Sequence, residues 1–200
     1  FLSPDLLGGK AANLAWMSRE GFPVPRWWVV TTAAFKQLLN ENGLSDWIEQ
    51  SLSNFEAHDD LNALEPIAAA IREKVLAATI PSQLRAELTQ YFANLDQVYF
   101  AVRSSVLGED AQGASFAGQM DSYLFQRGLT AIEESLLQVC ASAFNTRALQ
   151  YRITKGIALT DIRAAVIIQE MIEGEVSGVM FTANPLTGNR KQCLISAAWG

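Results

Sequence analysis

The sequence predicts an α+β fold, with strands towards both ends of the chain and a largely helical block between them. Apolar residues recur at helical spacing through about residues 33–95. Residues 98–103 instead alternate between two faces, and residues 164–172 form an almost continuous apolar run. The first pattern is typical of helices that cover a core, and the other two are typical of strands.

The N-terminal part is predicted to contain a helix, a strand and a second helix. The first helix follows Gly8-Gly9-Lys10, and Gly21 is suited to end it. Residues 27–31 are rich in aromatic and β-branched side chains and predict a strand. Thr32 is then a plausible N-cap for a helix over 33–42. Further helices are expected at 44–52, 61–79 and 81–95.

The C-terminal half is predicted to return from helices to strands. Thr130 and Glu133 form a capping-box pattern for a helix that runs to about residue 144, and another helix is expected over 145–155. Residues 164–172 and 176–182, joined by a short turn, are interpreted as a β-hairpin. A last strand is expected at 192–197.

The composition limits the classes of function. The net charge is −6 and the pI is about 4.8, which argues against a general nucleic-acid surface or an anionic-membrane surface. No apolar run reaches the roughly 20 residues that span a bilayer, and no signal peptide is recognisable. Cys140 and Cys193 are interpreted as reduced core residues of a cytoplasmic protein. The chain lacks an initiating Met and stops directly after a strand, so we expect it to be a piece of a larger protein.

Residues 101–125 hold most of the functional information. They predict a strand, a loop with three glycines, and a second short strand, with Arg103 where a buried strand normally carries an apolar residue. Glycines let backbone N–H groups approach an anion, and a guanidinium offers a planar fork to phosphate oxygens. The loop therefore suits a polyphosphate. The alternative is that Arg103 pairs with Glu109 or Asp110 and the glycines serve only turns.

Two further polar residues stand at unusual positions. Lys10 lies in the first turn of a helix, where the helix dipole disfavours a cation unless an anion also binds there. The alternative is an ordinary solvated lysine. Gln169 interrupts an apolar strand and could contact the adenine or ribose of a nucleotide, or bond to backbone at a sheet edge. His58, the only histidine, is interpreted as a solvated residue, since no His or Cys cluster accompanies it.

Three motifs occur in a fixed order. They are G-G-K-A-A-N-L at 8–14, V-R-S-S with A-S-F-A-G-Q-M-D-S-Y-L at 102–124, and Q-E-M-I-E-G-E-V-S-G-V-M-F-T-A-N-P-L-T-G at 169–188. Together they resemble the N-terminal nucleotide-binding domain of the phosphoenolpyruvate synthase and pyruvate, phosphate dikinase family, which includes rifampin phosphotransferase. The resemblance covers nearly the whole chain, 1–200, and is weakest over 43–95. It implies an ATP-grasp fold of dikinase type, incomplete at its C-terminal side, with ATP between two α+β lobes.

The resemblance also implies roles for single residues. Lys10 and Arg103 would contact ATP phosphates, and Gly118 with Gln119 would cover the phosphates. Gln169 would lie at the adenosine end, and Ser122 stands where the family usually has Thr. Second-tier candidates are Ser104, Ser115 and Asp121. No metal ligand is assigned within the chain, because the family's Mg²⁺ ligands are expected beyond Gly200.

The implied activity is that of the ATP-binding portion of a dikinase-type phosphotransferase. Such an enzyme converts ATP, pyruvate and water into AMP, phosphoenolpyruvate and phosphate through a phosphohistidine on a separate swivelling domain. That domain and an acceptor-binding domain are the expected partners, and the chain alone is expected to be inactive. The alternatives are an antibiotic-modifying kinase similar to rifampin phosphotransferase and a non-catalytic nucleotide-sensing module.

Overall fold

The chain folds into an α+β body and a separate two-stranded sheet. The computed structural model describes residues 3–53, 55, 63–106, 120–160 and 162–199. The helices within these ranges are α1 (Pro4–Arg19), α2 (Thr32–Glu41), α3 (Ser45–Ser53), α4 (Leu64–Leu76), α5 (Ser82–Phe92), α6 (Gly128–Ser142) and α7 (Thr146–Lys155). The strands are β1 (Trp27–Val30), β2 (Phe100–Val106), β3 (Ser122–Gln126), β4 (Ala164–Glu170), β5 (Val176–Phe181) and β6 (Leu194–Trp199).

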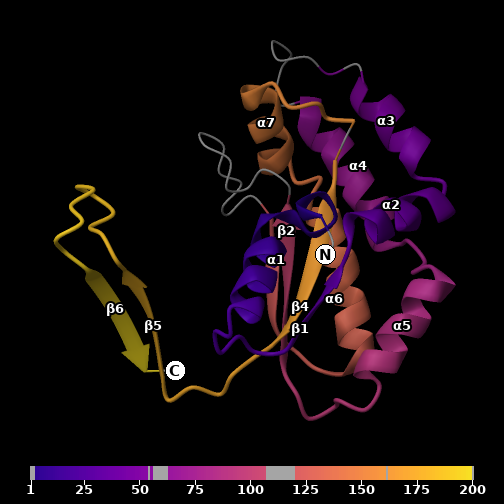
Figure 1. Ribbon diagram of the computed structural model, residues 1–200. Helices are drawn as coiled ribbons and strands as arrows, with labels where there is room; N and C mark the ends of the chain where they lie inside the picture. Colours follow the sequence, from indigo (N-terminus) through magenta and orange to yellow (C-terminus); the bar gives the residue numbers. More distant parts are fainter. Residues whose placement is uncertain (1–2, 54, 56–62, 107–119, 161, 200) are drawn as a thin grey trace.

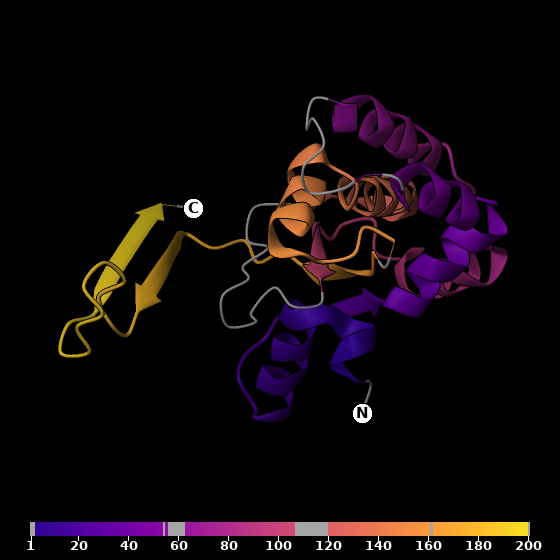
Figure 2. The ribbon, with the colours of Figure 1, turned by 90° about the horizontal axis from the view of Figure 1, so that it is seen from above.

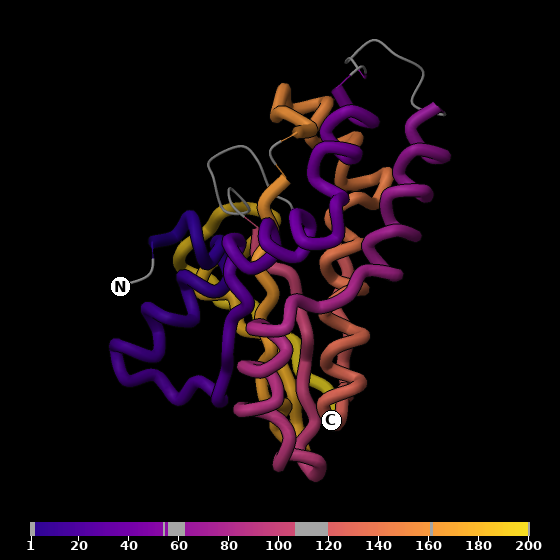
Figure 3. The backbone as a smooth tube through the Cα atoms, turned by 90° about the vertical axis from the view of Figure 1, so that its right-hand side faces the viewer, coloured from indigo at the N-terminus to yellow at the C-terminus, as the bar shows by residue number. Residues whose placement is uncertain are grey.

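The body is built on an antiparallel sheet with the strand order β1-β4-β2-β3. Helix α1 lies on one face of this sheet, and α4, α5 and α6 lie on the other, as Figures 2 and 3 show from two directions. Because side chains alternate along a strand, the two faces carry different residue sets. The face towards α4–α6 holds the large core, which includes Val102, Val166 and Ile168. The face towards α1 holds a small core centred on Ile167.

Aromatic side chains stabilise the part of the large core that lies between β1, β2 and α5. The rings of Trp28 on β1 and Phe92 on α5 lie 4.9 Å apart at a steep angle, and Phe92 and Phe100 lie 5.3 Å apart in the same manner. Edge-to-face contacts of this kind add roughly 0.5–1.5 kcal/mol to the burial of the rings. They join the edge strand β1, helix α5 and the central strand β2 into one unit.

The predicted hairpin between 164–172 and 176–182 is wrong. Strand β4 pairs with β1 on one side and with β2 on the other, so neither of its edges is open to β5. Strand β5 pairs instead with β6, in a second sheet that stands apart from the body in Figure 1. Residues 171–175 thus link two sheets, although their Glu-Gly-Glu sequence suits a turn.

The β5–β6 sheet is exposed along the whole length of both strands. Its exposed apolar residues include Val179, Met180 and Ile195. Cys193, next to β6, is exposed as well, so its predicted place in the core is wrong. Cys140 is buried as predicted, and burial raises the pKa of its thiol to about 12 because the thiolate would lose its solvation.

Two predicted helix starts need correction. The N-cap of α2 is Thr31, whose hydroxyl accepts the Ala34 N–H at 3.3 Å, while Thr32 Oγ1 donates to the Asp5 carbonyl. Helix α6 begins at Gly128, before the predicted capping box. The Glu133 carboxylate does not turn back to a cap but pairs with Arg85 of α5 at 3.0 Å. In both cases the side chain that was predicted to cap the helix bonds instead to a residue far away in the sequence.

Candidate functional site

Three predicted site residues share one face of the body sheet. Arg103 on β2 lies opposite Ile167 of β4 on one side and Ser122 of β3 on the other. Gln169 of β4 lies opposite Ala101, two residues from Arg103 along β2. Directly opposed residues in a sheet point to the same face, as do residues two apart on a strand. Arg103, Ser122 and Gln169 therefore all lie on the α1 face.

Helix α1 covers this face only in part. Leu7 and Ala11 pack on Ile167, and partly buried residues of β1 complete the contact. Lys10, between them in sequence, extends to β2, where its Nζ donates to the Ser104 carbonyl at 3.3 Å. The fold thus brings Lys10 to the residue that follows Arg103, although 93 positions separate the two in the sequence. The resemblance implies that both residues contact ATP phosphates, and the fold places them on the same side of the sheet.

Arg103 is half-buried, whereas every other residue of β2 is buried. Among the residues that the structure describes, no carboxylate pairs with its guanidinium. The alternative pairing with Glu109 or Asp110 falls outside the described residues. A guanidinium in such surroundings is suited to bind an anion in two-point geometry, since burial weakens competition from water.

Gln169 is not at a sheet edge. Its backbone lies between Trp27 of β1 and Ala101 of β2, so the alternative of edge pairing is wrong. Within the described ranges its half-buried side chain makes no hydrogen bond. The next residue, Glu170, points to the opposite face and pairs with Arg26 at 2.7 Å. The hydrogen bond from Arg26 lowers the pKa of Glu170 below its ordinary value.

A cleft of about 1190 Å³ lies beyond Gln169, where the body meets the linker to β5. The ends of β3 and β4 and the start of β5 line it, with Tyr99 and Phe125 as aromatic residues. The Met171 N–H donates to the Tyr99 carbonyl at 2.8 Å and so holds the linker against the body. At about 3.3 Å per residue, Arg103 and Gln169 are separated by about 7 Å along the strands. Arg103 and Gln169 thus follow one another along one face, and the cleft begins at the end of β4, next to Gln169 in the sequence.

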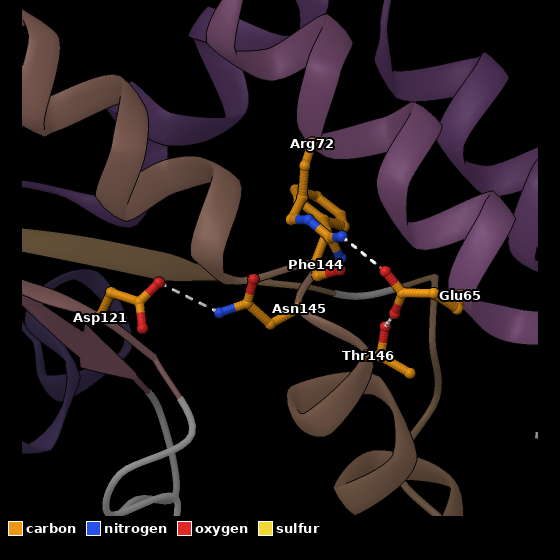
Figure 4. A network of polar contacts seen from close by, with 6 residues as sticks. All are labelled: Glu65, Arg72, Asp121, Phe144, Asn145 and Thr146. Carbon is orange, nitrogen blue, oxygen red and sulfur yellow. Dashed lines mark hydrogen bonds and ion pairs between the residues drawn. The ribbon is translucent and has the colours of Figure 1, made fainter.

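Asp121, a second-tier candidate, is engaged by the junction of α6 and α7. Its Oδ2 accepts from Asn145 Nδ2 at 3.3 Å, its other oxygen lies 3.6 Å from the Arg147 guanidinium, and its N–H donates to Ser142 Oγ at 3.2 Å. Figure 4 shows Asp121 and Asn145 facing each other. These bonds fix the start of β3, and hence Ser122, on the body. Nothing in the local sequence marked Asn145 or Ser142 as partners of Asp121.

The same junction is tied to α4 on its other side. Arg72 donates to the Phe144 carbonyl at 3.3 Å and to Glu65 at 2.9 Å, and Thr146 donates to Glu65 (Figure 4). The hydrogen bonds from Thr146 and Arg72 lower the pKa of Glu65. Helix α4 therefore fixes the α6–α7 junction through Arg72 and Glu65, and the junction in turn fixes the start of β3 through Asp121.

A comparison of the sequence with models of known protein families identifies the family of this chain. The model of the AMP/ATP-binding domain of pyruvate phosphate dikinase matches residues 4–200. The chain belongs to this family. The resemblance inferred from the three motifs is thereby confirmed.

Similar proteins carry names that are consistent with this family. The chain is 37% identical to a probable phosphoenolpyruvate synthase of Methanocaldococcus jannaschii and 34% identical to the phosphoenolpyruvate synthase of Pyrococcus furiosus. It is 37% identical to a rifampicin phosphotransferase of Streptomyces sviceus. Each alignment covers 98% of this chain but only 17%, 28% and 23% of the respective relative. The chain therefore spans less than a third of the length of each of these relatives.

Several predicted residues of the dikinase domain lie outside the described residues. They are Ser115, Gly118 and Gln119 of the glycine-rich loop, together with His58. Ser104 is described, and its side chain is buried on the face opposite Arg103, so only its carbonyl lies near Lys10.

Two searches concern the described part of the chain alone. It contains no group of three or more His, Cys, Asp or Glu side chains arranged to hold a metal ion. No helix in it combines the length and the apolar character that crossing a membrane requires.

Proposed function

We propose that this chain is the ATP-binding portion of a dikinase-type phosphotransferase of the phosphoenolpyruvate synthase kind, with an ATP-grasp fold. The family match supports nucleotide binding, and the names of the relatives support the phosphotransferase. The observation that carries the proposal is Arg103, half-buried on β2 and without a carboxylate among the described residues. Lys10, Ser122 and Gln169 stand around it on the same side of the sheet.

ATP would lie along the α1 face, with its phosphates at Arg103 and Lys10. The adenosine end would lie at Gln169 and the cleft beyond it, towards the linker to β5. Gly118 and Gln119 would cover the phosphates with backbone N–H groups, and the Ser122 hydroxyl would contribute from the base of the loop. Catalysis by these residues would consist of positioning and charge neutralisation, because none of them would form a covalent bond with the nucleotide.

In the full-length protein, ATP would give its β,γ-pyrophosphoryl group to a histidine on a mobile domain. That first transfer would leave AMP. Water would then release the terminal phosphate, and the remaining phosphoryl group would pass from the histidine to pyruvate to form phosphoenolpyruvate. Mg²⁺ would be supplied by ligands outside this chain. The described residues do not fit a metal site, and we assign no step to the metal.

A second acceptor is favoured by one observation. The rifampicin phosphotransferase of Streptomyces sviceus is as similar to this chain as the archaeal synthase, at 37% identity. A hydroxyl acceptor such as an antibiotic would use the same ATP half-reaction. AMP formation that depends on pyruvate supports the synthase, and AMP formation that depends on rifampicin supports the alternative.

The chain alone would not turn over ATP. The cleft at the proposed adenosine end is lined in part by Val176 and Ser177 of β5, a strand that is exposed along its whole length. A phosphate-bearing pocket needs both walls in place to exclude water.

The test is the replacement Arg103→Ala in the full-length protein, with ATP-dependent phosphorylation of the enzyme as the readout. Loss of a charge-stabilising donor lowers such rates by roughly 10²–10³-fold. Arg85→Ala is the matched control, since Arg85 pairs with Glu133 on the surface of the helical layer. Phosphorylation by Arg103→Ala at the rate of the control would refute the assigned role.

A further inference from the structure

Helix α1 contains an internal start that its own sequence does not cap. The helix is broken at Gly8, whose backbone has φ 72° and ψ 172°, so a second helical segment begins at Gly9. The first N–H groups of a helix have no partner within it and are normally satisfied by an N-cap side chain. Gly8 takes the N-cap position here and has no side chain to accept such a bond.

Ser105 of β2 supplies the missing acceptor. Its Oγ accepts the N–H of Ala11 at 3.0 Å, in a bond that is buried and joins residues 94 positions apart. Ala11 is the third residue of the new segment, and this is a position to which an N-cap hydroxyl normally bonds. Ser105 itself is fully buried on the α1 face, opposite Ala165. Ser105 therefore acts as an N-cap for α1 although it belongs to a different element, β2.

Gly8 allows the two backbones to approach closely enough for this bond. A Cβ at Gly8 would lie 2.3 Å from the Ser105 carbonyl oxygen and 2.6 Å from its Oγ. No side chain can be accommodated against backbone atoms at such a distance. The glycine and the serine are thus the two halves of one contact between α1 and β2.

The contact also fixes Lys10. Two consecutive residues of α1 bond to two consecutive residues of β2, Lys10 to the Ser104 carbonyl and Ala11 to the Ser105 hydroxyl. Arg103 directly precedes this pair on the strand. These two bonds therefore fix the position of the start of the helical segment relative to Arg103.

We propose that Ser105 is a positioning residue that sets the distance between Lys10 and Arg103, so that the two cations act together on the ATP phosphates. The inference rests on the proposed function, because it assigns Ser105 a role only through Lys10. Ser105 does not touch the nucleotide. Its hydroxyl acts by holding the helix start that carries the lysine.

The first test examines the cap itself in the 200-residue chain. Ser105→Ala should speed amide hydrogen exchange at Ala11 by roughly tenfold, the typical loss for an N-cap hydroxyl. Ser135→Ala is the control, because Ser135 is an equally buried serine whose hydroxyl bonds to the Ala131 carbonyl within α6. The control should leave exchange at Ala11 unchanged. Unchanged exchange in Ser105→Ala would overturn the cap.

The second test asks whether Ser105 acts through Lys10. Phosphorylation by ATP is measured in the full-length protein for Ser105→Ala, Lys10→Met and the double variant. A double-mutant cycle isolates the coupling between residues. Ser105→Ala should lower the rate about tenfold alone, and less than twofold when Lys10 is already absent. The Ser135→Ala control should change the rate in neither background.

The outcomes separate the two proposals. Independent, multiplying losses from Ser105 and Lys10 would overturn the positioning role and leave the proposed function intact. A fully active Lys10→Met variant would overturn both the assigned role of Lys10 and this inference. A Ser105→Ala variant with the activity of the wild type would overturn the inference alone.

Discussion

Arg103 is a cation placed in a strand that is otherwise buried from end to end. Among the described residues no carboxylate pairs with its guanidinium, and a half-buried charge without such a partner loses part of its hydration and gains little in return until an anion binds. Residues of this kind are kept at the expense of stability because function requires them. The same physical argument that supports the proposed phosphate contact of Arg103 therefore predicts that this residue lowers the stability of the ligand-free fold.

This argument predicts that Arg103→Met stabilises the chain in the absence of ATP. The methionine keeps much of the aliphatic volume and removes the charge, so the free energy of unfolding should rise by about 1 kcal/mol, as removal of a functional strain often does. Denaturant unfolding of the 200-residue chain measures it. Arg85→Met should give no gain, because the Arg85 side chain is 64% exposed and its removal leaves the Glu133 carboxylate without this partner. A destabilised Arg103→Met would show that the guanidinium has a structural partner.

At the scale of elements, local patterns predicted the helices and the strands β2 and β3, while pairing between distant strands was not predictable. Periodicity reports which face of an element is apolar, and that information is local. The partners of β4 come from residues 27–30 and 100–106, so the local turn signal at 173–175 led to a hairpin that does not exist. The Ser105 cap on α1 escaped prediction for the same reason. Arg103, Lys10 and Gln169 were singled out as candidates because each departs from its local sequence pattern.

The close contact between α1 and β2 gives a prediction for two glycines. Gly8→Ala should lower the free energy of unfolding by at least about 3 kcal/mol, because a Cβ there meets backbone atoms and the backbone region is nearly exclusive to glycine. Gly21 also has a positive φ, of 80°, but nothing lies within 4 Å of its added Cβ. Gly21→Ala should therefore cost only the backbone strain, roughly 1–2 kcal/mol.

Chemical unfolding of both variants measures the difference. Equal losses for Gly8→Ala and Gly21→Ala would mean that α1 does not approach β2 as closely as described. A large loss for Gly8→Ala alone would support the contact on which the position of Lys10 depends.

At the scale of the whole molecule, the body and the β5–β6 sheet face each other across the linker at 171–175 (Figure 1). The body supplies a complete hydrophobic core and one wall with cations, while the second sheet supplies an exposed, largely apolar surface. Residues of the body, of the linker and of β5 together line the cleft. The charged residues with proposed roles therefore all come from the body.

The most direct measurement of the central claim is calorimetric titration of the full-length protein with ATP, comparing wild type, Arg103→Met and Arg85→Met. If Arg103 holds the phosphates, its loss should weaken ATP binding by roughly 10-fold or more, since hydrogen bonds to charged groups contribute about 1.5–3 kcal/mol. Arg85→Met should bind as the wild type does. Equal ATP affinity in all three proteins would contradict the assignment of the α1 face as the nucleotide site.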